Sequence, residues 1–398
     1  MPELKLMGPR YKYPVSSAEL NRRLAAIQEE MKAKGLDCCI AQSQSTIFDS
    51  VIRYMIDSVT HPYSSTLLIP AEGEMVLITH GDDNDNAPIP PTLRNVEKLI
   101  LKPNCQTFAS TAGMIGSVLS KELNVRGFKR IGLILIQLIS SDTLDFVREN
   151  IHGCELVDFS KEFSYIKAVK SPEEWELIDL CISAHDRLMG MVPGLLRPGR
   201  MEYEILADLE HASRYIGCDW NGNVAVGATP NGSGVKFNQN FTANRRIEAG
   251  DGVTIMLEVS GPGGMYGELA RTFCLGEPRQ ALLNLFEIAK EAQHIVASEA
   301  KPGVTGRELN DVFDKYVTER GINKNRRFVG HGQGYDMMED PTISPYEDME
   351  MRNDMLLAIH PELVHNGQFS ICCDNFRITP NGGEILSKTE QKIFVVDI

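Results

Sequence analysis

The chain has 398 residues, of which 42% are hydrophobic and 24% are charged, and its formal net charge is −14. This length exceeds the usual size of a single hydrophobic core, so two domains are expected. The negative charge argues against nucleic acid and against anionic membrane surfaces as partners, which leaves a small-molecule substrate as the expected partner.

The first residues lack the basic and then apolar pattern of a signal peptide. The longest apolar run, 131–139, is too short to cross a bilayer. We therefore expect a cytoplasmic protein. The nine cysteines have no metal-type Cys-x-x-Cys spacing, so most of them are expected to be buried free thiols.

Residues 1–162 alternate strand and helix patterns, as expected of an α/β domain. Strands are predicted at 37–41, 65–69, 75–79, 98–101, 131–138 and 155–159, and helices at 17–34, 110–123 and 142–149. The pattern changes near Phe163, so a second domain is predicted at 163–398. A long helix then begins at Ser171-Pro172, where serine can cap the helix and proline suits its first position.

The second domain contains an internal repeat. Residues 197–205 resemble residues 301–309 at an offset of 104, and Gly217 and Gly321 are separated by the same offset. In both copies a basic-Pro-Gly turn precedes a helix that ends near the glycine. The repeat predicts two αβ halves related by pseudo-symmetry, with a cleft where they meet.

Two acidic residues flank a glycine-rich turn in the first of these halves. Glu258 and Glu268 stand on either side of Gly261-Pro262-Gly263-Gly264, between runs of β-branched and apolar residues. This pattern predicts a hairpin, and a turn centred on Gly263 places the two carboxylates opposite each other, roughly 5 Å apart. Facing carboxylates repel, so the pair requires a metal, a shared proton or a cationic ligand.

Several short motifs occur together in the order of one known family. They are Val226-Gly227-Ala228-Thr229-Pro230-Asn231, Gly250-Asp251, Arg271-Thr272, Gly330-His331-Gly332-Gln333-Gly334, Glu339-Asp340-Pro341 and the segment 374–383. On these residues the chain resembles the creatinase/prolidase family, which includes the methionine aminopeptidases. The resemblance implies an α/β protein with a creatinase-like N-terminal domain and a pseudo-symmetric C-terminal domain of the pita-bread fold.

Peptidases of that family hold two metal ions with two aspartates, a histidine and two glutamates. By resemblance these positions fall on Glu258, Glu268, His331, His360 and Cys373, so only the histidine is retained. The two histidines that assist peptide cleavage are replaced by Gln239 and Met338. The resemblance therefore implies a divergent member rather than an ordinary dinuclear peptidase.

The altered set of residues leaves two chemistries open. Glu268, His331, His360 and Cys373 offer two nitrogens, one sulfur and one oxygen, which suit one tetrahedral Zn²⁺ ion. Alternatively, Glu258, Glu268, His331 and His360 can act without a metal, as two carboxylates and two imidazoles for water activation and leaving-group protonation. Cys373 also has a simpler interpretation as a small buried hydrophobic residue.

Further residues are candidates for substrate contact. In the second domain they are Gln239, Tyr266, Gln333, Tyr335, Glu339 and His365. The resemblance also implies a homodimer in which the N-terminal domain of one subunit approaches the active site of the other. His61 and Tyr63 lie in the region that would do so.

The function expected from the resemblance is hydrolysis of a C–N bond in a small guanidino, amidine or amide compound. One alternative is a lyase, as in the branch that cleaves dimethylsulfoniopropionate. Others are an Xaa-Pro dipeptidase-like metallopeptidase and a non-catalytic binding protein, as in the histone-chaperone relatives. Polar residues at every altered ligand position count against loss of function, because decay should admit apolar substitutes.

Overall fold

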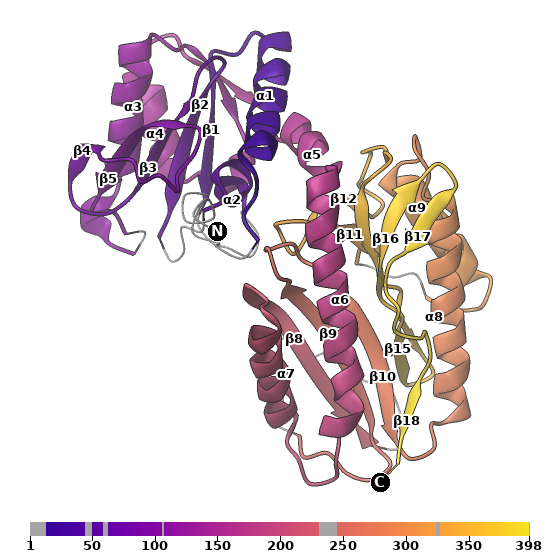
Figure 1. Ribbon diagram of the computed structural model, residues 1–398. Coiled ribbons are helices and arrows are strands. Elements are labelled where there is room, and N and C mark those ends of the chain that lie inside the picture. Colours follow the sequence, from indigo (N-terminus) through magenta and orange to yellow (C-terminus); the bar gives the residue numbers. More distant parts are fainter. Residues whose placement is uncertain are drawn as a thin grey trace. The chain divides into compact units, whose positions relative to one another are not determined.

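The structure is a computed structural model that describes residues 13–43, 50–58, 63–105, 107–230, 245–323 and 327–397. The chain divides into two compact units, one ending at Lys167 and the other beginning at Ala168 (Figure 1). Among the described residues, no helix combines the length and the apolar character needed to cross a membrane.

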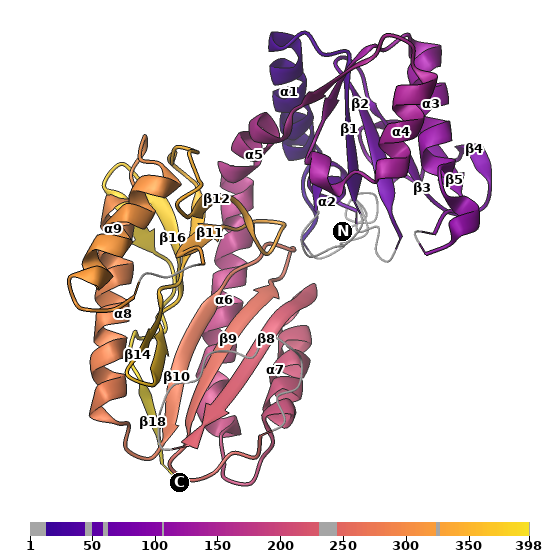
Figure 2. The same ribbon diagram turned by 180° about the vertical axis from the view of Figure 1, so that it is seen from behind.

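The first unit is built on a mixed seven-stranded sheet of order β4-β5-β3-β2-β1-β6-β7. The strands are β1 (Cys38–Ser43), β2 (Ser65–Pro70), β3 (Met75–His80), β4 (Asn84–Ala87), β5 (Val96–Lys102), β6 (Arg130–Leu133) and β7 (Glu155–Asp158). The described helices are α1 (Ser17–Ala33), α2 (Val51–Ile56), α3 (Met114–Arg126), α4 (Ser141–Asn150) and α5 (Ser160–Ala168). Helix α1 lies on one side of the sheet, and α3 and α4 lie on the other (Figures 1 and 2).

Helices α2 and α5 were not predicted from the sequence, and the strands of this unit differ from the prediction in two details. The strand predicted at 131–138 is wrong beyond Leu133, because Leu135 takes a left-handed conformation and a short 3-10 turn, Ile136–Leu138, follows. The apolar run continues past the sheet and becomes partly exposed there. The edge strand β4 was not predicted, because its sequence Asn-Asp-Asn-Ala is polar and has a low strand propensity.

The second unit contains a four-stranded sheet, β18-β10-β9-β8, and a five-stranded sheet, β12-β11-β13-β16-β17. The first comprises β8 (Trp220–Thr229), β9 (Gly252–Ser260), β10 (Leu269–Leu275) and β18 (Phe394–Val396). The second comprises β11 (Gly330–Gly332), β12 (Glu339–Ile343), β13 (Leu356–Ile359), β16 (Asp374–Thr379) and β17 (Gly382–Ile385). A separate hairpin joins β14 (Glu362–His365) to β15 (Gln368–Ile371).

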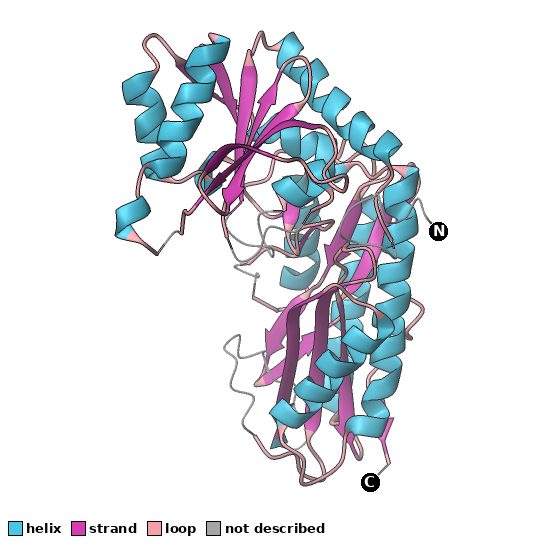
Figure 3. Ribbon diagram, turned by 60° about the vertical axis from the view of Figure 1, so that its left-hand side comes forward, coloured by secondary structure: helices cyan, strands magenta, loops and turns pink. Residues whose placement is uncertain are grey.

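Two pairs of helices accompany these sheets. Helices α6 (Pro172–Leu195) and α7 (Glu202–Ile216) pack on the four-stranded sheet, whereas α8 (Gln280–Glu299) and α9 (Gly306–Thr318) pack beside the five-stranded sheet (Figures 1 and 3). Ser171 caps α6 through a reciprocal capping box with Glu174, so the predicted helix start is confirmed.

The two halves of this unit follow the internal repeat seen in the sequence. Gly199 and Gly303, in the two basic-Pro-Gly turns, have φ values of 96° and 90°. Gly217 and Gly321, after the helices that follow, have φ values of 101° and 71°. All four conformations favour glycine. The pseudo-symmetric architecture of two αβ halves is therefore confirmed.

Strands β9 and β10 form the predicted hairpin. Leu257 pairs with Leu269, and Ser260 bridges Tyr266, so the same register places Glu258 opposite Glu268. The turn is centred on Gly263, which has a φ value of 90°. The prediction that the turn places these two carboxyl groups opposite each other is confirmed by this register.

Gly261 fixes the position of this turn against α6. A Cβ atom at Gly261 would lie 2.5 Å from the Cα and 2.6 Å from the Cβ of Cys181, whereas a Cβ atom at the exposed α6 position Gly190 would meet nothing within 4 Å. We expect Gly261→Ala to lower the free energy of unfolding by about 1–3 kcal/mol. The matched variant Gly190→Ala should raise it by about 0.5–1 kcal/mol. Urea denaturation of both variants tests this, and equal stabilities would contradict the proposed packing.

Candidate functional site

Three buried side chains converge where the hairpin of the first half meets the sheet of the second half. Glu268 precedes β10, His331 lies on β11, and His360 follows β13. Each offers one ligand atom, and these atoms lie within 4.8 Å of one another. Two imidazoles and a carboxylate in this arrangement could hold one metal ion.

The contacts of Glu268 show why this group requires a cation or a proton. Its Oε2 atom lies 3.2 Å from Nε2 of His331 but makes no hydrogen bond among the described residues. Nδ1 of His331 lies 2.9 Å from the carbonyl oxygen of Gly332. Because a carbonyl only accepts, Nδ1 carries a hydrogen, so Nε2 can donate to the carboxylate only when the ring holds a second proton. Either that proton or a metal ion bound between Nε2 and Oε2 would satisfy both atoms.

The pKa values of the two hairpin carboxyl groups are shifted in opposite directions. Burial opposes ionisation of Glu268, but the imidazoles of His360 and His331 and the thiol of Cys373 outweigh it and hold the pKa of Glu268 at about 2. Burial, followed by the charge of Glu268, raises the pKa of Glu258 well above its ordinary value. Glu268 is therefore the more acidic of the two carboxyl groups, and Glu258 is the one that binds a proton first.

One aromatic ring packs against both histidines. The rings of His331 and His360 lie 5.2 Å apart, and the half-buried ring of Phe328 meets them edge-on at 5.5 Å and 5.7 Å. Burial lowers the pKa of His360, although the charge of Glu268 partly offsets this effect. A neutral imidazole is the form that binds a metal.

Cys373 interacts with the site through a hydrogen bond. Its Sγ atom lies 3.1 Å from Oε1 of Glu268 and donates to it. Burial, followed by the charge of Glu268, raises the pKa of Cys373 well above its ordinary value, so the sulfur keeps its proton. The side chain also packs with Ala270, Phe369 and Ile371. Three of the four residues predicted to bind zinc thus lie together, and the fourth hydrogen-bonds one of them.

Sequence reasoning missed two asparagines that support the carboxyl groups. Nδ2 of Asn223 donates to Oε2 of Glu258 at 2.6 Å, and Oδ1 of Asn375 accepts from the backbone N–H of Glu268 at 2.8 Å. Strand alternation could have identified Asn375, because it lies two residues after Cys373. Asn223 offered no such signal, because a bulge between Asn221 and Asn223 interrupts its strand.

The residues predicted to contact substrate occupy different surroundings. Gln333 accepts a hydrogen bond from Asn375 at 2.6 Å, so it connects to Glu268 through one side chain. Tyr266 and Tyr335 are fully buried. Glu339 is held by Lys170 at 3.0 Å in a buried ion pair. His365 lies at the turn of the β14–β15 hairpin, opposite Gln368.

The last three predicted contacts lie in the first unit or outside the described residues. Tyr63 lies in the first unit, where its ring stacks on His80 with the centroids 3.8 Å apart. His61 and Gln239 lie outside the described residues. Their roles, and the homodimer itself, stay predictions.

A buried ion pair joins the two halves of the second unit next to the site. Nη2 of Arg271 lies 2.6 Å from Oδ1 of Asp374, and both side chains are fully buried. Arg271 also donates to the carbonyl oxygen of Cys373 at 2.9 Å. The segment before β16 that carries Cys373 is thereby held against β10, and Glu268 directly precedes β10.

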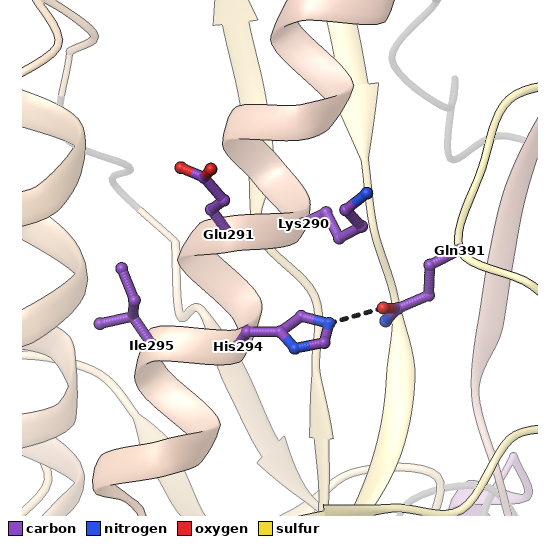
Figure 4. A pocket seen from close by; sticks show the side chains of 5 residues that line it. All are labelled: Lys290, Glu291, His294, Ile295 and Gln391. Carbon is purple, nitrogen blue, oxygen red and sulfur yellow. Dashed lines mark hydrogen bonds between the residues drawn. The ribbon is translucent and has the colours of Figure 1, made fainter.

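A surface pocket of about 480 Å³ lies next to the Arg271–Asp374 ion pair rather than at the site. It is lined by Lys290, Glu291, His294, Ile295 and Gln391 (Figure 4). His294 and Gln391 are hydrogen-bonded across it at 2.6 Å, and Gln391 donates to Asp374 at 2.8 Å. The pocket therefore borders the ion pair, and its lining includes none of the three converging residues.

Comparison of the chain with known proteins identifies a matching family and several relatives. The family model for metallopeptidase family M24 matches residues 176–380. The chain is 26% identical over 284 residues to an Xaa-Pro dipeptidase of Pyrococcus horikoshii, which covers 68% of this chain and 76% of that protein. It is 27% identical over 291 residues to an Xaa-Pro dipeptidase of Pyrococcus furiosus, which covers 68% and 81%.

Solved structures share the fold at low identity. Dipeptidase PepE from Mycobacterium ulcerans has a TM-score of 0.78 at 19% identity and covers 96% of this chain and 100% of its own. The prolidase from Pyrococcus horikoshii has a TM-score of 0.74 at 20% identity and covers 93% and 99%.

Removing the buried arginine tests the support of the site. We expect Arg271→Met to lower the free energy of unfolding by about 3–5 kcal/mol, because it leaves the buried Asp374 without its cation. Arg307→Met, which breaks an exposed pair with Asp348, should cost no more than about 1 kcal/mol. Chemical denaturation measures both changes. Similar losses in the two variants would show that the buried pair contributes no special stability.

Proposed function

Because the chain belongs to metallopeptidase family M24, we propose that it hydrolyses the C–N bond of a small amide, amidine or guanidino compound at a site for one metal ion. The observation that carries this proposal is the convergence of Glu268, His331 and His360 within 4.8 Å. A carboxylate that faces a ring nitrogen of His331 supports a proton or a cation at that point.

The donor set suits one ion better than two. Paired metal ions in hydrolases depend on carboxylates that bridge them. Here the last of the family's carboxylate positions is occupied by Cys373, whose thiol donates to Glu268. Burial and the neighbouring charge raise the pKa of Glu258, which makes it a poor ligand for a second ion. Two imidazoles and one carboxylate remain, and this is a ligand set for Zn²⁺.

The proposed roles follow from these pKa shifts. A bound Zn²⁺ ion would polarise the substrate carbonyl and make a water molecule more acidic. The raised pKa of Glu258 suits it to act as an acid: in its protonated form it can donate a proton to the leaving nitrogen, and it regains a proton from the attacking water. The amide of Asn223 holds the carboxyl group of Glu258 in place during this exchange. Glu268 stays charged, and the thiol of Cys373 fixes its orientation.

Xaa-Pro dipeptidase activity is the second candidate. The names of the two Pyrococcus relatives favour it. Against it stand Gln239 and Met338, where the family's assisting histidines are expected by resemblance. A panel of Xaa-Pro dipeptides, N-acyl amino acids, cyclic amidines and guanidino compounds separates the two candidates. Release of proline alone would favour the dipeptidase.

Metal content distinguishes a one-ion site from a two-ion or metal-free site. We expect elemental analysis of the protein, dialysed after loading with zinc, to give about one equivalent per chain. His360→Ala should lower this value strongly, because it removes a ligand. Cys373→Ser should retain the metal, because serine still offers a donor to Glu268. Two equivalents in the parent protein, or loss of zinc from the serine variant, would contradict the proposed ligand set.

The role of Glu258 as proton donor predicts a kinetic effect. With the best substrate of the panel, Glu258→Gln should lower kcat by about 100-fold or more, because general acid catalysis typically contributes that much. Glu287→Gln changes an exposed glutamate on α8 and should leave kcat unchanged. Zinc content, measured in parallel, should be the same in both variants. An active Glu258→Gln protein would remove Glu258 from the mechanism.

A further inference from the structure

The segments that carry His360 and Cys373 belong to one hairpin whose hydrogen-bonded ladder is interrupted at the site. Strands β13 and β16 pair up to Ile359, which lies opposite Asp374, and β14 and β15 continue in the same register. The interruption covers two opposed pairs of residues: His360 with Cys373, and Pro361 with Cys372. The proline has no N–H to donate to its opposite neighbour. Another group must therefore hold the two segments together at this level.

Gln293, on α8, occupies this interruption. Its side chain is fully buried. Its Nε2 atom donates to the carbonyl oxygen of Ile359 at 2.8 Å and to that of Cys372 at 3.1 Å. Because carbonyl oxygens only accept, these contacts fix which end of the carboxamide faces the hairpin. One side chain thus joins the two segments where the ladder is interrupted.

Each of these two carbonyl groups belongs to the peptide unit that leads into a residue of the site. Ile359 directly precedes His360, and Cys372 directly precedes Cys373. Because peptide units are planar, holding the carbonyl group also orients the backbone nitrogen of the next residue. Gln293 therefore determines where the imidazole and the thiol leave the backbone.

The oxygen of the same carboxamide is held from the opposite side. Nε2 of Gln391 donates to Oε1 of Gln293 at 2.5 Å and to Oδ2 of Asp374 at 2.8 Å. This orientation leaves Oε1 of Gln391 to accept from Nε2 of His294, at 2.6 Å, in the surface pocket. A continuous set of hydrogen bonds thus runs from the pocket to the hairpin and fixes the Gln293 amide in one orientation.

We propose that Gln293 is a positioning residue of the site: its carboxamide replaces the missing ladder bonds and sets the spacing of His360 and Cys373 around Glu268. An apolar side chain of similar size would fill the same space but would leave both carbonyl oxygens without this donor, so the two segments could separate. The proposal rests on the proposed one-ion site and adds the residue that keeps its two segments in register.

Zinc affinity separates positioning from a general effect on folding. Dissociation constants are measured by competition with a chelator of known affinity. We expect Gln293→Met, which removes the amide, to weaken zinc binding by about 10- to 100-fold, as is typical when a group that orients metal ligands is lost. Leu282→Ala, in the buried core on α8, should lower the thermal stability but leave the zinc affinity unchanged. Gln280→Met, at an exposed glutamine of the same helix, should change neither.

Two results of this comparison would overturn the proposal. One is a zinc affinity of Gln293→Met equal to that of the wild type. The other is an equal loss of affinity in Leu282→Ala, since that result would reduce the role of Gln293 to stability. If Gln293→Met does not fold, Gln391→Met decides, because it removes the donor to Oε1 of Gln293 from the half-buried surface. It should weaken zinc binding by a smaller factor, and no change would count against the proposal.

A readout without metal distinguishes this proposal from the proposed function. Protein with isotope-labelled histidine shows the ring signals of His360 in its nuclear magnetic resonance spectrum, and His360→Ala identifies them. In the metal-free protein Gln293→Met should shift these signals, and Leu282→Ala should leave them in place. If wild-type protein binds no zinc, the one-ion function fails, and these signals alone decide. Unshifted signals in Gln293→Met would then show that Gln293 does not position His360.

Discussion

The buried charge of Glu268 is the interaction on which the arrangement of the site depends. Removing a carboxylate from water costs several kcal/mol unless nearby groups compensate for it. Compensation comes from the thiol of Cys373 on one oxygen and from two imidazoles near the other. Because the hydrogen on Nδ1 of His331 is directed to Gly332, the ring nitrogen that faces Glu268 offers a hydrogen only when the ring holds a second proton. The positive charge that Glu268 requires is therefore either that proton or a metal ion.

The duplicated architecture of the second unit brings these groups together. The first half contributes the hairpin with both glutamates, and the second half contributes the histidines and Cys373. The bridge between Ala270 and Cys373 joins β10 to the segment before β16, and the ion pair of Arg271 and Asp374 holds this junction in place. Neither half contains the whole site. Changes that shift one half against the other should therefore affect Glu268 before they affect either core.

Much of the fold and part of the site could be predicted from the sequence, whereas the remaining contacts depended on how the side chains pack. The hairpin register followed from a turn centred on Gly263, and the helix start at Ser171 followed from its capping pattern. The role of Cys373 did not follow, because neither alternation nor resemblance shows which atom its sulfur meets. Phe328 and Asn223 were missed for a related reason, since they act on the site from segments without a chemical motif. The strand expected at 131–138 failed because hydrophobicity alone does not show where a sheet ends.

The central claim is that one ion fits between Glu268 and the two histidines while Cys373 remains a hydrogen-bond donor to Glu268. Anomalous diffraction at the zinc edge from crystals grown with Zn²⁺ tests it most directly. The account predicts one strong peak, bonded to Oε2 of Glu268, Nε2 of His331 and the imidazole of His360, with the sulfur of Cys373 outside the coordination shell. Two peaks in the cleft, or a single ion bonded to that sulfur, would contradict it.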